Sequence, residues 1–140
     1  MKRKYIVSLF FAFLPTLFLF TGCSQKQGSS SPSGSGSADY RQISSGEAAA
    51  MMETEDNYII LDVRTSEEYQ EGHIPNAINI PNETIQSEKL AELPDKEQLI
   101  FVYCRSGNRS KQASQKLADA GYTNIAEFSG INEWHGDIVK

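Results

Sequence analysis

The sequence is poor in the residues that most often bind metals or form disulfides. Its 140 residues include only two cysteines, Cys23 and Cys104, and two histidines, His73 and His135. These four side chains lack the ligand spacing of a metal site, so we expect neither a metal nor another cofactor. Two cysteines also allow at most one disulfide, and a chain of this length suggests a single folded domain.

Positive charge is also scarce. The chain carries 13 lysines and arginines against 18 aspartates and glutamates, and three of the basic residues lie within residues 1–22. Without that segment the formal charge is −8. Such a surface disfavours nucleic acid, so an anionic substrate has to be attracted by a local group of cations.

The N-terminal apolar run, from Tyr5 to Phe20, falls short of the ~20 residues that a membrane-spanning helix needs. Three basic residues precede this run, and Thr21-Gly22-Cys23 follows it. Residues 1–22 therefore resemble the signal peptide of a bacterial lipoprotein, although Phe20 stands where leucine is usual. An uncleaved membrane anchor and an ordinary secretory signal are the alternatives.

The lipoprotein resemblance implies that Cys23 is lipidated and that the protein is extracytoplasmic, anchored to a bacterial membrane by its lipid. Residues 23–38 then form a linker, because they are dominated by Ser and Gly and have no large apolar side chain to bury. Lipidation of Cys23 would leave Cys104 as the only free thiol. An exported domain with one thiol needs a chemical reason to keep it, since cysteines outside the cytoplasm usually pair.

Residues 39–140 have the pattern of an α/β domain. Two helix starts are predicted by capping-box sequences, Ser44 with Glu47 and Thr65 with Glu68. Strands that alternate with helices favour a mainly parallel central sheet flanked by helices on both faces. We expect strands over 40–43, 57–63, 77–80, 99–103 and 124–128, helices over 44–53, 65–72, 84–93 and from the loop after Cys104 to Gly121, and a last helical turn over 132–135.

Cys104 begins the segment Cys-Arg-Ser-Gly-Asn-Arg-Ser between a predicted strand and a predicted helix. The backbone N–H groups of such a loop, and the positive end of the helix, converge on the sulfur and favour its thiolate form. Arg105 and Arg109 add fixed positive charge suited to a small oxyanion. Asp62 and Arg64 follow another strand, and the carboxyl ends of parallel strands meet at one edge, where ligands bind.

Four motifs of residues 39–140 together resemble the single-domain rhodanese family. They are Asp62-Val63-Arg64, residues 71–81 (Glu-Gly-His-Ile-Pro-Asn-Ala-Ile-Asn-Ile-Pro), the Cys104 loop, and Ser129-Gly130 followed by Trp134. The resemblance implies a rhodanese-like fold and a sulfurtransferase, in which Cys104 takes a sulfane sulfur from a donor such as thiosulfate. The resulting persulfide passes the sulfur to a thiol or to cyanide.

The resemblance also implies that the loop after Cys104 binds the substrate and that Asp62 and Arg64 support the site. The loop residues are Arg105, Ser106, Gly107, Asn108, Arg109 and Ser110. Arg109 has an alternative role, in which its side chain braces the domain.

Three other functions stay open at this point. Cysteine phosphatases and arsenate reductases of related architecture place an arginine after five intervening residues, whereas that position here is Ser110 and Arg109 is one position early. A non-catalytic rhodanese module would keep the motifs and bind a membrane-side partner. A thiol redox protein would lack a second cysteine in the mature domain to resolve its disulfide.

Several single residues carry their own expectations. His73 could act as a general base, but we favour a structural role for it. Asn76 and Ser129 stand where the family commonly has glycine; asparagine tolerates left-handed backbone, and Ser129 changes the rim of the pocket. We expect Trp134 to pack as a core or rim aromatic.

Overall fold

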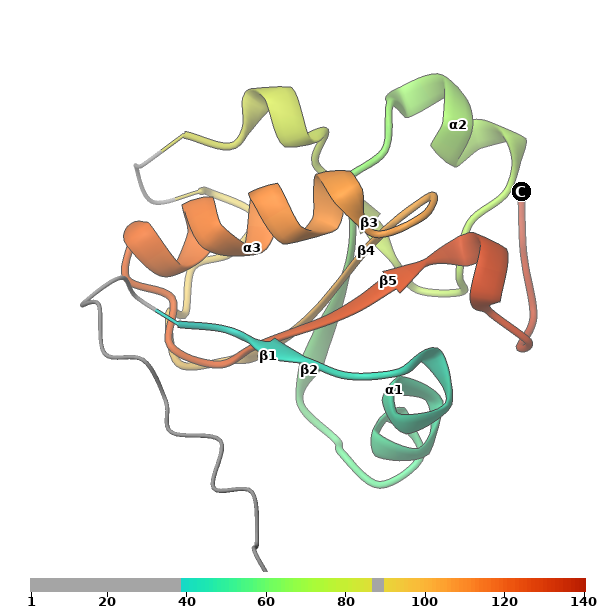
Figure 1. Ribbon diagram of the computed structural model, residues 1–140, viewed down its shortest axis with the longest axis horizontal. Coiled ribbons are helices and arrows are strands. Elements are labelled where there is room, and N and C mark those ends of the chain that lie inside the picture. Colours follow the sequence, from blue (N-terminus) through green and yellow to red (C-terminus); the bar gives the residue numbers. More distant parts are fainter. Residues whose placement is uncertain (1–38, 87–89) are drawn as a thin grey trace, which may run out of the picture. The chain divides into compact units, whose positions relative to one another are not determined.

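The structure is a computed structural model that describes residues 39–86 and 90–140 (Figure 1). The predicted signal peptide, Cys23 and the linker lie outside the described residues and stay predictions. The described part has a five-stranded sheet in the order β1-β5-β4-β2-β3, in which all neighbouring strands are parallel. The strands are β1 (Arg41–Gln42), β2 (Tyr58–Asp62), β3 (Ile78–Asn79), β4 (Leu99–Cys104) and β5 (Ile125–Gly130).

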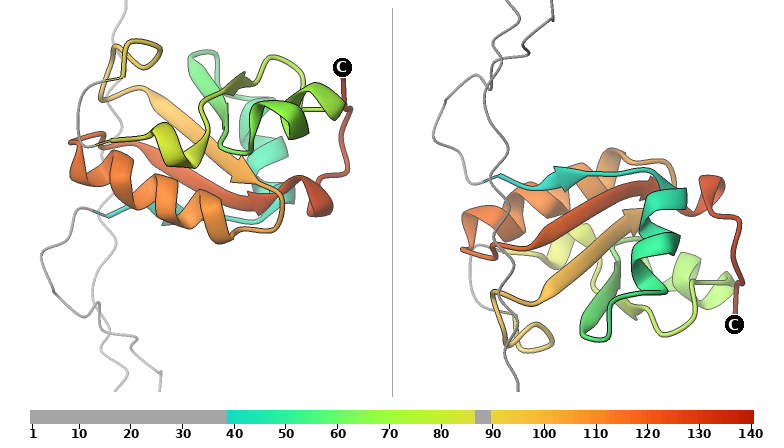
Figure 2. Two further views of the ribbon diagram at one scale, coloured as in Figure 1. Left: turned by 90° about the horizontal axis from the view of Figure 1, so that it is seen from above. Right: turned by 90° about the horizontal axis from the view of Figure 1, so that it is seen from below.

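Helices cover both faces of this sheet, which confirms the predicted α/β architecture. They are α1 (Ser45–Met52), α2 (Ser66–Glu71) and α3 (Asn108–Asp119), with short 3-10 helices η1 (Asn82–Thr84) and η2 (Ile131–Glu133). Ala113 and Leu117 of α3 belong to one apolar cluster, the α3 cluster. Ala48 of α1 belongs to a second apolar cluster, the α1 cluster. The two views of Figure 2 show α3 and α1 on opposite faces.

The central strand β4 divides its side chains between these two clusters. All six of its residues are buried. Because side chains alternate along a strand, Val102 and Cys104 lie in the α3 cluster, whereas Phe101 and Tyr103 lie in the α1 cluster. The loop to α3, which begins at Arg105, therefore starts from a fixed position at the end of β4.

Both predicted capping boxes are present. The Ser44 side chain accepts a hydrogen bond from the backbone of Glu47, whose carboxylate accepts one from the backbone of Ser44. Thr65 and Glu68 make the same reciprocal pair at the start of α2. Each box satisfies N–H groups that have no partner within the helix, so these two helix starts are fixed by local sequence.

The predicted helix over 84–93 is wrong in its described residues. Residues 82–84 form η1, Ile85 is extended, and residues 87–89 lie outside the described residues. The Tyr122 hydroxyl donates to the carbonyl oxygen of Leu93 (2.8 Å) and accepts from the N–H of Leu90 (3.2 Å). The apolar spacing therefore reflects Ile85, Leu90 and Leu93, which pack in the α3 cluster. Tyr122, rather than a helical pattern of hydrogen bonds, holds the backbone at Leu90 and Leu93.

Among residues 39–86 and 90–140, no helix is both long enough and apolar enough to span a bilayer.

Candidate active site

Cys104 is the last residue of β4, and its side chain is buried on the α3 face of the sheet, with 1% of the residue exposed. Residues 105–107 connect it to α3. Gly107 has a φ of +99°, in the left-handed region that residues with a Cβ rarely adopt, and this turn leads directly into α3. Cys104 therefore lies at the carboxyl edge of the sheet and beside the first turn of a helix.

Polar groups of the loop, of α3 and of β5 surround the sulfur. The Gly107 N–H donates to Cys104 Sγ (3.1 Å), and the Ser110 hydroxyl oxygen lies 3.6 Å from it. Burial acts to raise the pKa of the Cys104 thiol. Hydrogen bonds from the Ser110 side chain and from the N–H groups of Ser110, Ser106 and Gly107 outweigh burial and lower this pKa below its ordinary value. The loop thus stabilises the thiolate, the nucleophilic form of cysteine.

A β-bulge in β5 forms a second wall of the site. The register between β4 and β5 shifts next to Cys104, which pairs with Gly130, so β5 contains one extra residue. Ser129 in this bulge has a φ of +67°, and its carbonyl oxygen lies 3.7 Å from Cys104 Sγ. Gly130 passes so close to the loop that a Cβ would overlap the carbonyl group of Arg105. β5 runs beyond the predicted end at residue 128 because Gly130 still pairs with Cys104 after the bulge.

Glu127 belongs to the site although no motif revealed it. The residue is 1% exposed, and its Oε1 accepts hydrogen bonds from the Ser110 hydroxyl (2.6 Å) and from the Ser129 N–H (2.8 Å). The available signal was a lone acidic residue inside the apolar segment Ile125–Phe128. A carboxylate in a buried strand needs hydrogen-bond partners, and these had to come from the neighbouring loop and helix.

The two arginines of the loop have different surroundings. Arg109 donates two hydrogen bonds to the Glu68 carboxylate of α2, at 2.6 and 2.9 Å. Arg105 is exposed, as are Ser106 and Asn108. The structure therefore places Arg109 as a brace between α3 and α2, and it leaves Arg105 as the cation of the loop that faces solvent.

Asp62 and Arg64 reach the same edge of the sheet as Cys104 but lie on its other face. The Arg64 guanidinium forms an ion pair with Asp62 (2.6 Å) and donates to the carbonyl oxygen of Gly72 (2.7 Å). It also lies 5.8 Å from the centre of the Tyr103 ring. Burial, and then the charge of Asp62, raise the pKa of the Tyr103 phenol. Asp62, Arg64 and Tyr103 therefore stabilise the carboxyl ends of β2 and β4, and the sheet separates Asp62 and Arg64 from the sulfur of Cys104.

Other singled-out residues have structural surroundings. The His73 ring stacks on Tyr69 with ring centres 3.7 Å apart, and its Nδ1 lies 3.0 Å from the Tyr69 carbonyl oxygen, which fits the structural role we favoured. Asn76 has a φ of +64°, as expected for an asparagine in place of glycine. Trp134 packs 5.8 Å from Phe128, measured between ring centres, at the edge of the α1 cluster.

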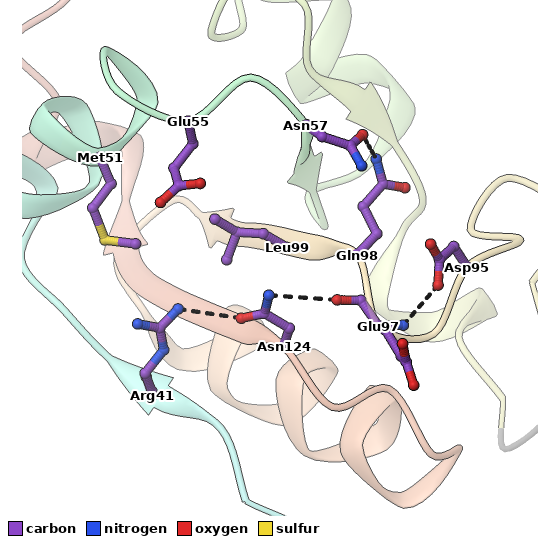
Figure 3. A pocket seen from close by; sticks show the side chains of 9 residues that line it. All are labelled: Arg41, Met51, Glu55, Asn57, Asp95, Glu97, Gln98, Leu99 and Asn124. Carbon is purple, nitrogen blue, oxygen red and sulfur yellow. Dashed lines mark hydrogen bonds between the residues drawn. The ribbon is translucent and has the colours of Figure 1, made fainter. Parts of the chain in front are cut away.

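The described part of the chain brings together no group of three or more His, Cys, Asp or Glu side chains that could hold a metal ion. A polar pocket lies at the opposite edge of the sheet, where β4 begins (Figure 3). Side chains of this pocket are hydrogen-bonded to each other: Gln98 donates to Asn57 (2.8 Å), and Arg41 donates to Asn124 (3.3 Å).

The family model described as Rhodanese-like domain matches residues 44–137. This span contains β4, the cysteine loop, α3 and the bulge of β5. The chain belongs to the rhodanese family. The rhodanese domain is 37% identical over 73 residues to the thiosulfate sulfurtransferase PspE of Escherichia coli, which covers 52% of this chain and 70% of PspE.

Two further comparisons agree with this family. The rhodanese domain is 34% identical over 96 residues to the thiosulfate sulfurtransferase GlpE of Coxiella burnetii, covering 68% of this chain and 87% of GlpE. It also matches a solved rhodanese from E. coli with bound anions, with a TM-score of 0.55 at 37% identity, over 59% of this chain and 98% of that chain. The fold predicted from the motifs, a rhodanese-like α/β domain, is therefore confirmed.

Proposed function

We propose that this protein is a sulfurtransferase that carries a sulfane sulfur on Cys104 as a persulfide. The observation that supports this most is the set of backbone N–H groups beside Cys104 Sγ, in which the Gly107 N–H donates to the sulfur at 3.1 Å and those of Ser106 and Ser110 also lower its pKa. Such N–H groups stabilise a single negative charge on sulfur. The named activity of PspE and GlpE agrees with this chemistry.

The proposed reaction has two displacements, with thiosulfate as the reference donor. In the first, the Cys104 thiolate attacks the outer sulfur of thiosulfate. A new sulfur–sulfur bond forms, the old one breaks, and its electron pair leaves with sulfite. In the second, a thiolate or cyanide attacks the outer sulfur of the persulfide, and Cys104 regains its electron pair as thiolate. Splitting the transfer in this way is covalent catalysis, and ping-pong kinetics are its signature.

The exposed part of the loop provides the attraction for an anionic donor. Arg105 carries a fixed charge at the solvent side, and the N–H groups next to Cys104 point at the place where negative charge develops. Arg109 is already paired with Glu68, so it does not fold over a bound phosphate as the arginine of a cysteine phosphatase would. This arrangement favours a sulfur donor over a phosphate ester.

The direct test is thiocyanate formation from thiosulfate and cyanide by residues 39–140, compared with Cys104→Ser and with the control Glu97→Gln at the far edge of the sheet. We expect turnover in the wild type and the control and none in Cys104→Ser. Intact-mass measurement after incubation with thiosulfate should show the gain of one sulfur atom in the wild type. A folded wild type that neither turns over nor gains sulfur would contradict the proposal and favour a binding module.

We also propose that Cys23 is lipidated and that the domain is held outside the cytoplasm on a bacterial membrane. The support is the sequence alone: a basic start, an apolar run and Thr21-Gly22-Cys23, followed by a Ser- and Gly-rich linker. Metabolic labelling with palmitate in a bacterial host should mark the full chain and not Cys23→Ala. Equal labelling of both would contradict lipidation at this residue.

A further inference from the structure

The hydroxyl of Ser110 lies between two groups that can carry negative charge. Its oxygen is 3.6 Å from Cys104 Sγ and 2.6 Å from Glu127 Oε1. Ser110 is fully buried, and Glu127 and Cys104 are each 1% exposed. The same oxygen also lies 3.0 Å from the Gly107 carbonyl and 3.1 Å from the Ser129 carbonyl, so the contact with Glu127 is the shortest of the four. A hydroxyl has one hydrogen, which it donates to one acceptor at a time.

The Ser110 hydroxyl can give its hydrogen either to the Glu127 carboxylate or to a Cys104 thiolate, and the carboxylate is the nearer acceptor. A thiolate and a carboxylate at this distance also repel each other, and burial weakens the screening by water. We propose that Glu127 is a positioning residue, whose carboxylate holds the Ser110 hydrogen and withholds that hydrogen bond from the Cys104 thiolate.

The consequence for sulfur transfer rests on the proposed function. In a persulfide the negative charge lies on the outer sulfur, about 2 Å beyond Sγ and further from the buried acid. An ionised Glu127 therefore opposes the free thiolate more than it opposes the persulfide. Glu127 would raise the tendency of Cys104 to take up sulfur.

Other ionisable groups of the described residues also interact with Glu127 or with Cys104. Tyr40, in the segment before β1, has a pKa raised by burial and then by the charge of Glu127. Arg109 of α3 interacts electrostatically with Cys104 and is held by Glu68. The sheet neighbours of Glu127 are Gln42 on β1 and Val102 on β4, which do not ionise. Replacing the Glu127 carboxylate therefore changes one charge beside the sulfur and leaves the others in place.

The test measures the rate of iodoacetamide alkylation of Cys104 against pH in residues 39–140 of the wild type, Glu127→Gln and Glu97→Gln. The glutamine side chain can accept from the Ser129 N–H and donate to the Ser110 oxygen, which frees the Ser110 hydrogen for sulfur. We expect Glu127→Gln to lower the pKa of the thiol by about one unit. Glu97→Gln should leave it unchanged. An unchanged or raised pKa in folded Glu127→Gln would overturn the proposal.

A second pair of variants tests the route through Ser110. In a Ser110→Ala background, adding Glu127→Gln should shift the thiol pKa by less than half as much as in the wild type. An equal shift would mean that Glu127 does not act through the Ser110 hydroxyl, and it would overturn the proposed route. Circular dichroism checks that each variant is folded. If Glu127→Gln does not fold, Glu127→Leu replaces it, and we expect Glu127→Leu to lower the pKa of the thiol as well.

This experiment needs no sulfur donor, so its outcome is separate from that of the proposed function. A pKa shift without thiocyanate formation would retain the positioning role of Glu127 and reject sulfur transfer from thiosulfate. Thiocyanate formation without a pKa shift would retain sulfur transfer and reject the positioning role.

Discussion

Glu68 and Arg109 join α2 to α3 by two hydrogen bonds, at 2.6 and 2.9 Å. The same carboxylate accepts from the Thr65 N–H (3.1 Å) and so completes the capping box of α2. One acidic side chain therefore fixes both a helix start and the residue next to Ser110. The position of the cysteine loop depends in part on a helix that follows a different strand.

We expect Glu68→Gln to destabilise the fold by about 1 kcal/mol at pH 7, the range of a partly exposed ion pair. The hydrogen bonds from Arg109 lower the pKa of Glu68 to about 2. A carboxyl whose pKa is depressed on folding stabilises the protein above its unfolded pKa and loses that effect as pH falls towards the folded value. The difference from wild type should therefore shrink between about pH 5 and pH 2.

Urea unfolding at several pH values measures this difference, and Glu71→Gln, an exposed residue at the end of the same helix, is the control. Glutamine also serves in a capping box, so the helix start is retained. A difference that stays constant down to pH 2 would show that the ion pair is not its source.

Gly107→Ala should cost about 1–2 kcal/mol, because a Cβ is strained at a left-handed φ. The φ of Gly107 is +99°. Gly46→Ala in α1, where a Cβ would make an ordinary contact with Ser44 Oγ at 4.0 Å, should instead stabilise the fold by about 0.5–1 kcal/mol. Thermal unfolding of the two variants provides the comparison. A loss in both would point to a cause other than backbone conformation.

Gly130→Ala tests contact rather than conformation, since Gly130 has an extended backbone with a φ of −167°. Its new methyl group would overlap the Arg105 carbonyl, and overpacking of this kind costs about 1–3 kcal/mol. We also expect slower alkylation of Cys104, because the displaced loop moves its N–H groups away from sulfur. Wild-type stability together with a wild-type alkylation rate would argue against this close approach.

Asp62→Asn should destabilise the fold by about 3 kcal/mol, because it leaves the Arg64 guanidinium without its buried partner. The alkylation profile of Cys104 in the folded variant should match wild type, since the sheet lies between the two groups. Chemical denaturation and the alkylation profile together check both statements. A shifted thiol pKa in folded Asp62→Asn would give Asp62 a direct electrostatic role at the sulfur.

Local patterns were sufficient for much of this fold. Capping boxes and buried runs predicted α1, α2, β2 and β4, because their hydrogen bonds and burial are decided by neighbouring residues. The segment over 84–93 was mistaken for a helix, since the backbone N–H of Leu90 and the carbonyl of Leu93 are bonded to the Tyr122 hydroxyl. Its packing is decided by a residue far along the chain.

The site divides in the same way. Cys104 and the donors of its loop were evident because they follow one another in sequence. Glu127 and the partner of Arg109 were not, because Ser110 and Glu68 reach them only through tertiary packing. Asp62 and Cys104 lie on opposite faces of the sheet because of where each falls in the alternation of its strand. The sequence argument placed both residues at one edge of the sheet but did not assign a face to either.

The order of strands in the sheet has a consequence during synthesis. β5 lies between β1 and β4, so the strand that carries Glu127 and Ser129 is also the one that ties the first strand to the rest (Figure 1). A chain that emerges N-terminus first holds β1 without its partner, and the Cys104 thiol without its second wall, until the last strand arrives. Long-range pairing of this kind slows folding. The nascent chain therefore passes through an interval in which its thiol is open to oxidants and to alkylating agents.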